Sequence, residues 1–208
     1  MSDILSKTQE WVSNIFSSKF PTVNIVSKVD GKIYKVRDLP DKQGAADLLA
    51  RVRLRLMTLC DRLEQKYPDK NQIKQMKKNF RPDPLRFLEA TPEASSTSYS
   101  VNKGESIHLC LRQRSGADES LVPEDTIMFV ALHELAHVCT VSIGHTPEFW
   151  NNFGWLLQEA EALNLYTRQN FQAHPVSYCG IYITDSPTYD PSKDGTDLSV
   201  GGIFLSKK

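Results

Sequence analysis

The chain has 208 residues, of which 40% are hydrophobic and 24% are charged, and its 25 basic and 25 acidic side chains give zero net charge. This composition is typical of a globular protein with one domain or two small ones, and it excludes a collagen-like, coiled-coil or wholly disordered chain. Zero net charge does not favour nucleic-acid binding over the whole surface. The sequence shows neither an apolar run of the roughly 18 residues that a membrane span needs nor a secretory signal. We therefore expect an intracellular protein that is not secreted.

The four cysteines lie far apart in the sequence and form no C-x-x-C pair. This wide, irregular spacing does not favour a zinc-knuckle site. Cys60 and Cys110 occur in apolar runs, which is typical of small buried side chains. We expect free thiols in a reducing compartment at all four positions, which are Cys60, Cys110, Cys139 and Cys179.

Helical periodicity and turn signals predict three helices and a hairpin in the first part of the chain. Asp30-Gly31 is a turn signal between two runs of β-type residues, which is typical of a hairpin. The apolar residues of the long central helix form one continuous face, and prolines end both later helices. The expected helices cover residues 3–20, 43–67 and 71–80, and the expected strands cover 22–27 and 32–36.

A basic segment between Arg51 and Phe87 holds 11 Lys or Arg residues against four Asp or Glu residues. It forms either a surface for a polyanion or a solvated helix face that acids elsewhere in the chain balance. We favour the second interpretation, because the basic residues are scattered around the helices with few aromatic residues between them. At most weak binding to nucleic acid is expected.

A Ser/Thr-rich loop at residues 91–98 precedes a second predicted hairpin, with strands at 99–101 and 106–112. Within the second strand, His108 falls on the face opposite to the apolar residues, so we interpret it as a sheet-face residue and not as a ligand. Close to the C-terminus the chain is rich in Ser, Pro, Asp and Gly, and only residues 198–205 are expected to form a strand.

The most informative stretch is His133-Glu134-Leu-Ala-His137, an H-E-x-x-H motif inside a strongly apolar helix that begins near Pro123. Positions i and i+4 of a helix lie one turn apart on one face, so His133 and His137 can bind one zinc ion. Glu134 lies next to the first ligand, where it can accept a proton from water at the metal. Such a polar cluster in an apolar helix is costly without a metal or hydrogen-bond partners.

We expect His145 to supply a third ligand at the corner between two helices. We expect Gly144 to end the first helix, and Thr146-Pro147 to begin the next one. A third nitrogen ligand leaves the fourth tetrahedral position for water, as a catalytic zinc site requires. The alternative is a set of core histidines that hydrogen bonds satisfy, but three histidines within thirteen positions favour zinc. The predicted metal ligands are therefore His133, His137 and His145, with Zn²⁺ as cofactor and Glu134 as catalytic base, and His174 is expected in a loop.

Two other metal-binding schemes of this class fit the sequence less well. The metzincin pattern H-E-x-x-H-x-x-G-x-x-H needs a shorter link than the one from His137 to His145, which is two residues too long, and no methionine follows to form the Met-turn. A scheme with a glutamate ligand would use an acid of the next helix, and His145 makes such a ligand unnecessary. The acids in question are Glu148, Glu159 and Glu161.

His133-Glu-Leu-Ala-His137 followed by His145-x-x-x-Phe149-Trp150 resembles the WLM family of small zinc metallopeptidases, with SprT-type peptidases as more distant relatives. The link between the second and third histidines is two residues longer than is usual in that family. The resemblance covers roughly residues 97–165. The hairpin sequence ahead of the helix and the Tyr-Cys-Gly at 178–180 are also similar to metallopeptidases of large DNA viruses.

The resemblance implies an α+β, zincin-like fold in which a small mixed or antiparallel sheet packs on the H-E-x-x-H helix, with additional N-terminal helices. We expect an N-terminal helix and hairpin extension (1–40), a metallopeptidase domain (41–183) and a loop-rich tail (184–208). The strand at 106–112 is expected to offer an exposed edge that holds an extended peptide. Tyr178 is the best candidate for a second group that polarises the scissile carbonyl; in the alternative interpretation it only packs.

The sequence thus predicts a zinc-dependent metallopeptidase with a protein or peptide substrate, no membrane span, and a location in the cell or in a virion. Two alternatives stay open. One is a structural or virion-associated protein that keeps the zinc site without proteolysis, although structural zinc sites usually have four protein ligands. The other is a protease of DNA–protein crosslink repair, as in members of the family that act in repair. Neither the natural substrate nor the oligomeric state follows from the sequence.

Overall fold

The computed structural model describes residues 19–194 and 206–207. The helix expected over residues 3–20 and the strand expected over 198–205 therefore lie outside the described residues, apart from Lys19 and Phe20, which form a bend.

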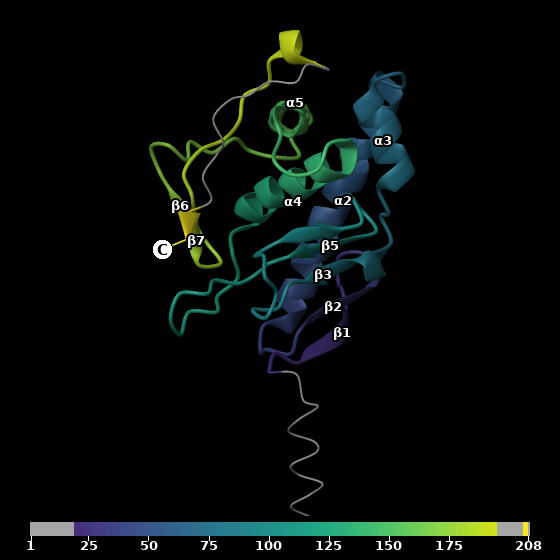
Figure 1. The fold of residues 1–208 in the computed structure, drawn as a ribbon. Coiled ribbons are helices and arrows are strands. Elements are labelled where there is room, and N and C mark those ends of the chain that lie inside the picture. Colours follow the sequence, from purple (N-terminus) through teal and green to yellow (C-terminus); the bar gives the residue numbers. More distant parts are fainter. Residues whose placement is uncertain (1–18, 195–205, 208) are drawn as a thin grey trace, which may run out of the picture.

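Five short strands form a mixed sheet in the order β1-β2-β3-β5-β4 (Figure 1). The hairpins β1–β2 and β4–β5 are antiparallel, whereas β3 pairs in parallel with both β2 and β5. Both predicted hairpins are confirmed, and the first lies in the same sheet as the second. The strands are β1 (Thr22–Val26), β2 (Ile33–Arg37), β3 (Phe87–Glu89), β4 (Tyr99–Val101) and β5 (Ser106–Leu109).

The prediction that the strand at 106–112 offers an exposed edge is wrong. β5 is an inner strand between β3 and β4, and β4 is the edge of the described sheet. The two strands of a hairpin carry similar residue patterns, so the sequence does not show which of them pairs with a third strand. The parallel partner of β5 is β3, which lies about twenty residues earlier in the chain.

Four described helices pack against the sheet and against one another. The long helix α2 packs against β1, β2 and β3, and α4 packs against β4 and β5; α2 and α4 also contact each other, and α5 packs on α4 (Figure 1). This arrangement confirms an α+β fold with a small mixed sheet packed on the H-E-x-x-H helix. The helices are α2 (Lys42–Lys66), α3 (Asn71–Asn79), α4 (Glu124–Cys139) and α5 (Pro147–Ala162), and two 3₁₀ turns cover Pro84–Arg86 and Pro191–Lys193.

The core lies between this sheet and the helices, and the sequence patterns explain its position. In β2, Tyr34 and Val36 are buried while Ile33 and Lys35 are exposed, as a strand with one covered face requires. The apolar face of α2 is buried along its whole length, from Ala45 to Leu63. Burial of this kind is the main favourable contribution to folding. In the described part of the chain, no helix combines the length and the apolar character that crossing a membrane requires.

A second, antiparallel sheet of three strands follows the helices, with β6 (Val176–Tyr178), β7 (Ile181–Ile183) and β8 (Ser206–Lys207). A disulfide between Cys110 and Cys179 joins it to the end of β5. The expectation of free thiols is therefore wrong for these two residues, and it is confirmed for Cys60 and Cys139, which are free and buried. The two bridged cysteines lie 69 positions apart, and only the folded topology brings them together.

Candidate metal centre and cleft

Helix α4 presents two of the predicted ligands to a cleft. Between Thr126 and Cys139 every residue of the helix is buried except His133 and His137. The two imidazole ring centroids lie 5.0 Å apart, as the one-turn separation of positions i and i+4 predicts. The apolar remainder of the helix fixes this orientation, because rotating the helix would expose its buried side chains.

A structured link brings the third histidine back to the helix. α4 ends at Cys139, and not at Gly144 as the sequence suggested, because Thr140 takes an extended conformation. The side chain of Glu148 accepts hydrogen bonds from the backbone N–H groups of Val141 (3.3 Å) and Ser142 (3.2 Å). These contacts hold the link in the form of a compact loop.

The start of α5 agrees with the prediction. Thr146 is the N-cap, and its hydroxyl accepts a hydrogen bond from the backbone N–H of Phe149 at 3.3 Å. Pro147 occupies the first helical position, where its missing N–H costs nothing. Gly144, with a φ of +85°, makes the turn that leads into this cap. His145 is thereby placed between two fixed helices.

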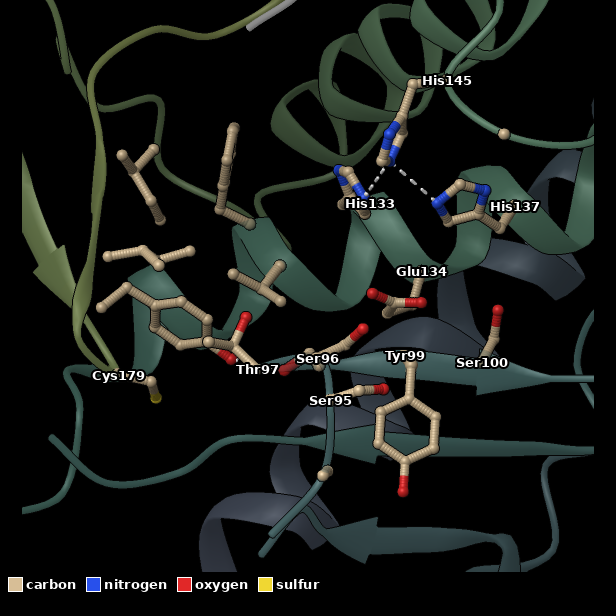
Figure 2. A pocket seen from close by; sticks show the side chains of 18 of the residues that line it. Ser95, Ser96, Thr97, Tyr99, Ser100, His133, Glu134, His137, His145 and Cys179 are labelled. Atoms are coloured by element: carbon tan, nitrogen blue, oxygen red, sulfur yellow. Dashed lines mark hydrogen bonds between the residues drawn. The ribbon is translucent and has the colours of Figure 1, made fainter. Parts of the chain in front are cut away.

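The three histidines converge on one point (Figure 2). The Nε2 atom of His145 lies 3.1 Å from Nε2 of His133 and 3.2 Å from Nε2 of His137. One ligand atom from each of the three residues lies within 4.8 Å of the others. The structure therefore brings together all three residues that the sequence singled out.

This trio fits a zinc ion. Two nitrogens bound to one tetrahedral zinc at about 2.0–2.1 Å lie about 3.3–3.4 Å apart, close to the 3.1 and 3.2 Å measured between the Nε2 atoms. Hydrogen bonds satisfy such a trio only in part, because a ring nitrogen that donates cannot also accept. One cation would satisfy all three lone pairs.

The protonation of the trio also suits a metal. Burial, together with the neighbouring His145 and Lys103, lowers the pKa of His137 to about 4. Burial likewise lowers the pKa of His133 and of His145. The imidazoles are thus neutral near pH 7, which is the form that binds metal ions.

Aromatic side chains of α5 enclose the trio. The ring of Phe149 stacks on His137 with centroids 4.2 Å apart, and Trp150 stacks on His145 at 5.3 Å. Phe153 meets His133 edge to face at 5.2 Å. These contacts restrict the rotation of each imidazole, so the Phe149-Trp150 pair has a structural role in shaping the site.

Glu134 is buried beside the trio and faces strand β4. In Figure 2 its carboxylate lies between the three histidines and Ser100. Burial outweighs the hydrogen bonds from the side chain and the backbone of Ser100, which lower the pKa of Glu134, and the pKa rises to about 8. A carboxyl group held in this way has a fixed orientation and a pKa near neutrality, which are the properties of a general base.

All four residues open onto one cleft of about 680 Å³. Helix α4 forms one wall, and the segment Ser95–Ser100, which includes the start of β4, forms another. Tyr178 and Ile181 of the hairpin β6–β7 also line the cleft, and Figure 2 shows Cys179, in the turn of this hairpin, on the side away from the trio. The helix α4 and the strands β4, β6 and β7 thus contribute to one cleft, as expected of a site for an extended ligand.

Tyr178 lines this cleft and is itself buried. Its hydroxyl lies 2.6 Å from the hydroxyl of Ser98, and that serine oxygen accepts a hydrogen bond from the backbone N–H of Cys110 at 2.9 Å. Burial raises the pKa of Tyr178, so the phenol stays protonated and able to donate. Tyr178 is thus packed and also placed at the cleft.

The other residues that the sequence raised lie outside the trio. The ring of His108 stacks on Tyr99 on the sheet, and His174 is exposed in a turn outside the cleft. Glu159 accepts hydrogen bonds from Lys66 and Tyr67, and Glu161 pairs with Arg168. With Glu148 occupied by the link, none of the three glutamates joins the histidines.

Sequence reasoning missed Ser100 and Lys103, both of which belong to the hairpin β4–β5. Lys103 lies in its turn, with a φ of +55°, beside Gly104 at +116°. A Cβ atom at Gly104 would come within 2.9 Å of Val138 Cγ1, so only glycine allows this turn to approach the site helix. Gly104 in the turn is the only signal of this contact in the sequence, and it does not show that the turn packs against α4.

Comparison with known proteins gives the family. An uncharacterized protein of Acanthamoeba polyphaga mimivirus is 33% identical over 163 residues, which cover 77% of this chain and 82% of that protein. Uncharacterized proteins of Invertebrate iridescent virus 6 and Invertebrate iridescent virus 3 are 38% and 44% identical over 69 residues, which cover 33% of this chain and 38% and 42% of theirs. The predicted likeness to proteins of large DNA viruses is confirmed.

Among solved structures, the crystal structure of Wss1 from Saccharomyces cerevisiae matches with a TM-score of 0.45 and 22% identity, over 62% of this chain and 87% of that one. The WLM domain model matches residues 72–197, which is more than half of the 208-residue chain. The protein therefore belongs to the WLM domain family, the metallopeptidase-type family that its histidine motif resembles.

Proposed function

We propose that this protein is a zinc-dependent peptidase that cleaves protein or peptide substrates. The observation that carries the proposal is the convergence of three neutral imidazoles beside the buried carboxyl group of Glu134, in one cleft. A purely structural metal site has no use for a base at its open side, and it is usually closed by a fourth protein ligand. His133, His137 and His145 would hold the zinc.

When bound, zinc supplies positive charge that polarises the scissile carbonyl and acidifies a water molecule. Glu134 removes a proton from the attacking water as the water oxygen adds to the carbonyl carbon. It then delivers this proton to the amide nitrogen as the carbon–nitrogen bond breaks, so the products are a carboxylic acid and an amine. The hydrogen bonds from Ser100 hold the Glu134 carboxyl group in place for both transfers.

Strand β4 is the element that would hold the substrate. It is the edge of the described five-stranded sheet, and its residues Tyr99 and Ser100 line the cleft below the trio. An extended peptide that adds to this edge would gain main-chain hydrogen bonds and would run past Glu134. Tyr178, protonated and bonded to Ser98, is our candidate for a second group that polarises the carbonyl oxygen.

The basic segment gives no specific support to a role on DNA. Seven of its 11 cations form ion pairs with described acidic residues, as the balanced-surface interpretation expects. The three uncharacterized proteins named above come from viruses, which supports a place of action in an infected cell or in a virion.

Replacement of Glu134 by Gln tests the proposal. The amide fills the same space but cannot accept the proton, so peptide hydrolysis should fall by about 10²–10⁴-fold while zinc stays bound. The matched control is Glu161→Gln, which changes a surface acid of α5 that pairs with Arg168. Equal hydrolysis by the Glu134→Gln variant, or no hydrolysis of unfolded proteins by the zinc-loaded wild type, would contradict the proposal.

A further inference from the structure

The cleft extends beyond the metal trio to an arginine that has no acidic partner. Arg114 is half-buried and lines the same cleft as His133 and Glu134. Its guanidinium donates one hydrogen bond, from Nη2 to the carbonyl oxygen of Ala90 at 3.1 Å. Within residues 19–194, no carboxylate pairs with it. A guanidinium has five N–H donors, so most of its capacity is unused.

This state sets Arg114 apart from the other described arginines. Arg62 and Arg81 also lack an ion pair, but both are exposed and hydrated. The remaining described arginines each pair with an acid; they are Arg37, Arg51, Arg53, Arg55, Arg86, Arg112 and Arg168. Burial lowers the pKa of Arg114, as expected for a cation that has lost water without gaining a counter-ion.

The acid whose charge acts on Arg114, Glu89, is already used by other groups. Glu89 accepts a hydrogen bond from Nε of Arg112 at 2.8 Å on one oxygen, and from the backbone N–H of Arg37 at 2.7 Å on the other. Glu134 is the only acid that lines the cleft in the described chain. The second cation of the cleft, Lys103, donates to the backbone carbonyls of Thr140, Val141 and Ser142. Of the two cations that line this cleft in the described chain, Arg114 is therefore the one that remains available to bind an anion.

Arg114 lies beside the turn of β6–β7, and Figure 2 shows Cys179 of that turn on the side of the cleft away from the three histidines. An added Cβ at Gly180, in the turn of β6–β7, would lie 3.9 Å from Cβ of Arg114. Next to it, Gln113 donates from Nε2 to the carbonyl oxygen of Ser177 at 3.0 Å, and the disulfide of Cys179 adds a covalent tie. Tyr178, Glu134 and Arg114 all line this one cleft, so an extended peptide bound in it can contact both Glu134 and Arg114.

We propose that Arg114 forms an anion-binding subsite that receives a carboxylate of the substrate while another part of the same peptide chain presents its scissile bond to Glu134. This inference rests on the proposed peptidase function. A guanidinium binds a carboxylate through two parallel hydrogen bonds, which is the strongest pairing open to it. The hydroxyls of Ser96 and Thr97 line the cleft between Glu134 and Cys179 in the view of Figure 2 and can donate further hydrogen bonds. The carboxylate comes either from an Asp or Glu side chain or from the C-terminus of the peptide.

Binding of fluorescent peptides to the zinc-loaded Glu134→Gln variant tests the subsite without cleavage. Peptides with Glu or Gln at each position, and with a free or amidated C-terminus, separate the two sources of the carboxylate. The carboxylate peptide should bind about tenfold or more tightly than its neutral partner. Arg114→Ala should remove this preference and leave the affinity for the neutral peptide unchanged, and Arg114→Lys should keep part of it. Arg81→Ala, the exposed control, should change neither affinity.

Equal affinity for charged and neutral peptides, or a preference that survives Arg114→Ala, overturns the subsite. So does a result in which Arg114→Ala weakens only the binding of a single-stranded oligonucleotide. Failure of the peptidase function gives a different pattern, because the carboxylate preference would persist in an intact protein that never cleaves. Cleavage of Glu and Gln peptides at equal rates by the wild type and by Arg114→Ala would overturn the subsite alone.

Discussion

The Nζ atom of Lys103 lies 2.9 Å from the backbone carbonyl oxygen of Thr140, so the turn of β4–β5 closes the C-terminal end of the metal-site helix. The same ammonium donates to the carbonyls of Val141 and Ser142, at the start of the link that carries His145. A cation at this end of a helix also interacts favourably with the helix dipole. This one side chain thereby fixes both α4 and the link that carries His145.

Lys103→Met should therefore weaken both the fold and the metal site. The methionine keeps the length of the chain but leaves three carbonyls without this donor, and we expect a loss of about 1–2 kcal/mol in the free energy of unfolding. Zinc affinity should fall as well, because the link that positions His145 loosens. Urea denaturation and competition with a chelator measure the two effects. The control is Lys78→Met, which changes an exposed residue of α3 that pairs with no acid among the described residues. An unchanged zinc affinity would show that the link does not depend on this contact.

The disulfide between Cys110 and Cys179 should make the stability of the protein sensitive to reductant. It closes a loop over 69 positions, and cross-links of this kind typically contribute about 2–4 kcal/mol. A dithiol reductant should lower the unfolding midpoint of the wild type and have no effect on the Cys110→Ser/Cys179→Ser variant. Thiol titration of the unreduced, unfolded protein should give two free thiols, from Cys60 and Cys139; four would contradict the disulfide.

Asp30 should contribute to stability in a pH-dependent way. Its carboxylate accepts hydrogen bonds from Arg53 Nη2 at 2.9 Å and from the Tyr34 hydroxyl at 2.7 Å, and the side chains of Asp30 and Arg53 are 9% and 7% exposed. Burial alone would raise the pKa of Asp30, but the hydrogen bonds from Tyr34, Lys32 and Arg53 outweigh it and lower the pKa. The stabilisation is therefore present above the unfolded pKa of about 3.9 and is lost as the pH falls through the lower, folded value.

Asp30→Asn should accordingly cost about 3 kcal/mol at pH 7, because it leaves Arg53 buried without its counter-ion. The difference from wild type should shrink when urea denaturation is repeated near pH 3. Asp38→Asn, which removes an exposed pair with Lys42, serves as control and should have little effect at either pH. The same difference at both pH values would mean that the Asp30 charge does not contribute.

Nucleic-acid binding should be weak and should show a limited salt dependence. Four cations of the basic segment have no ion pair in the described chain, and they are Arg62, Lys74, Lys78 and Arg81. Each neutralised phosphate of duplex DNA contributes about −0.9 to the slope of log affinity against log salt, so we expect a slope no steeper than about −4. Fluorescence anisotropy over a salt series measures it. Tight binding that survives high salt would instead favour an action on DNA-bound proteins.

Local patterns in the sequence predicted most of the fold. The bounds of α2 and α3 lie within one residue of the predicted ranges, because their apolar faces and the following prolines are local signals. The Thr146-Pro147 cap of α5 and the spacing of the histidines are local as well. These two features place the three histidines, which is why the convergence of His145 on α4 could be predicted.

Contacts between distant segments could not be predicted in this way. The parallel pairing of β5 with β3 leaves β4 at the edge, and no pattern within either strand shows it. The disulfide partner of Cys110, the contact of Ser100 with Glu134 and the unpaired state of Arg114 all depend on which elements meet in space. A single sequence shows which side chains are present, but it does not show which of them lie close together in the folded chain.

The zinc content of three purified proteins tests the metal centre most directly. The wild type should bind about one zinc per chain, and His145→Ala should lose most of it, because two imidazoles one turn apart make a weak site. His174→Ala, which removes an exposed histidine outside the cleft, should keep the wild-type content. A His145→Ala variant that still holds about one zinc per chain would contradict the trio of His133, His137 and His145 on which the proposed peptidase depends.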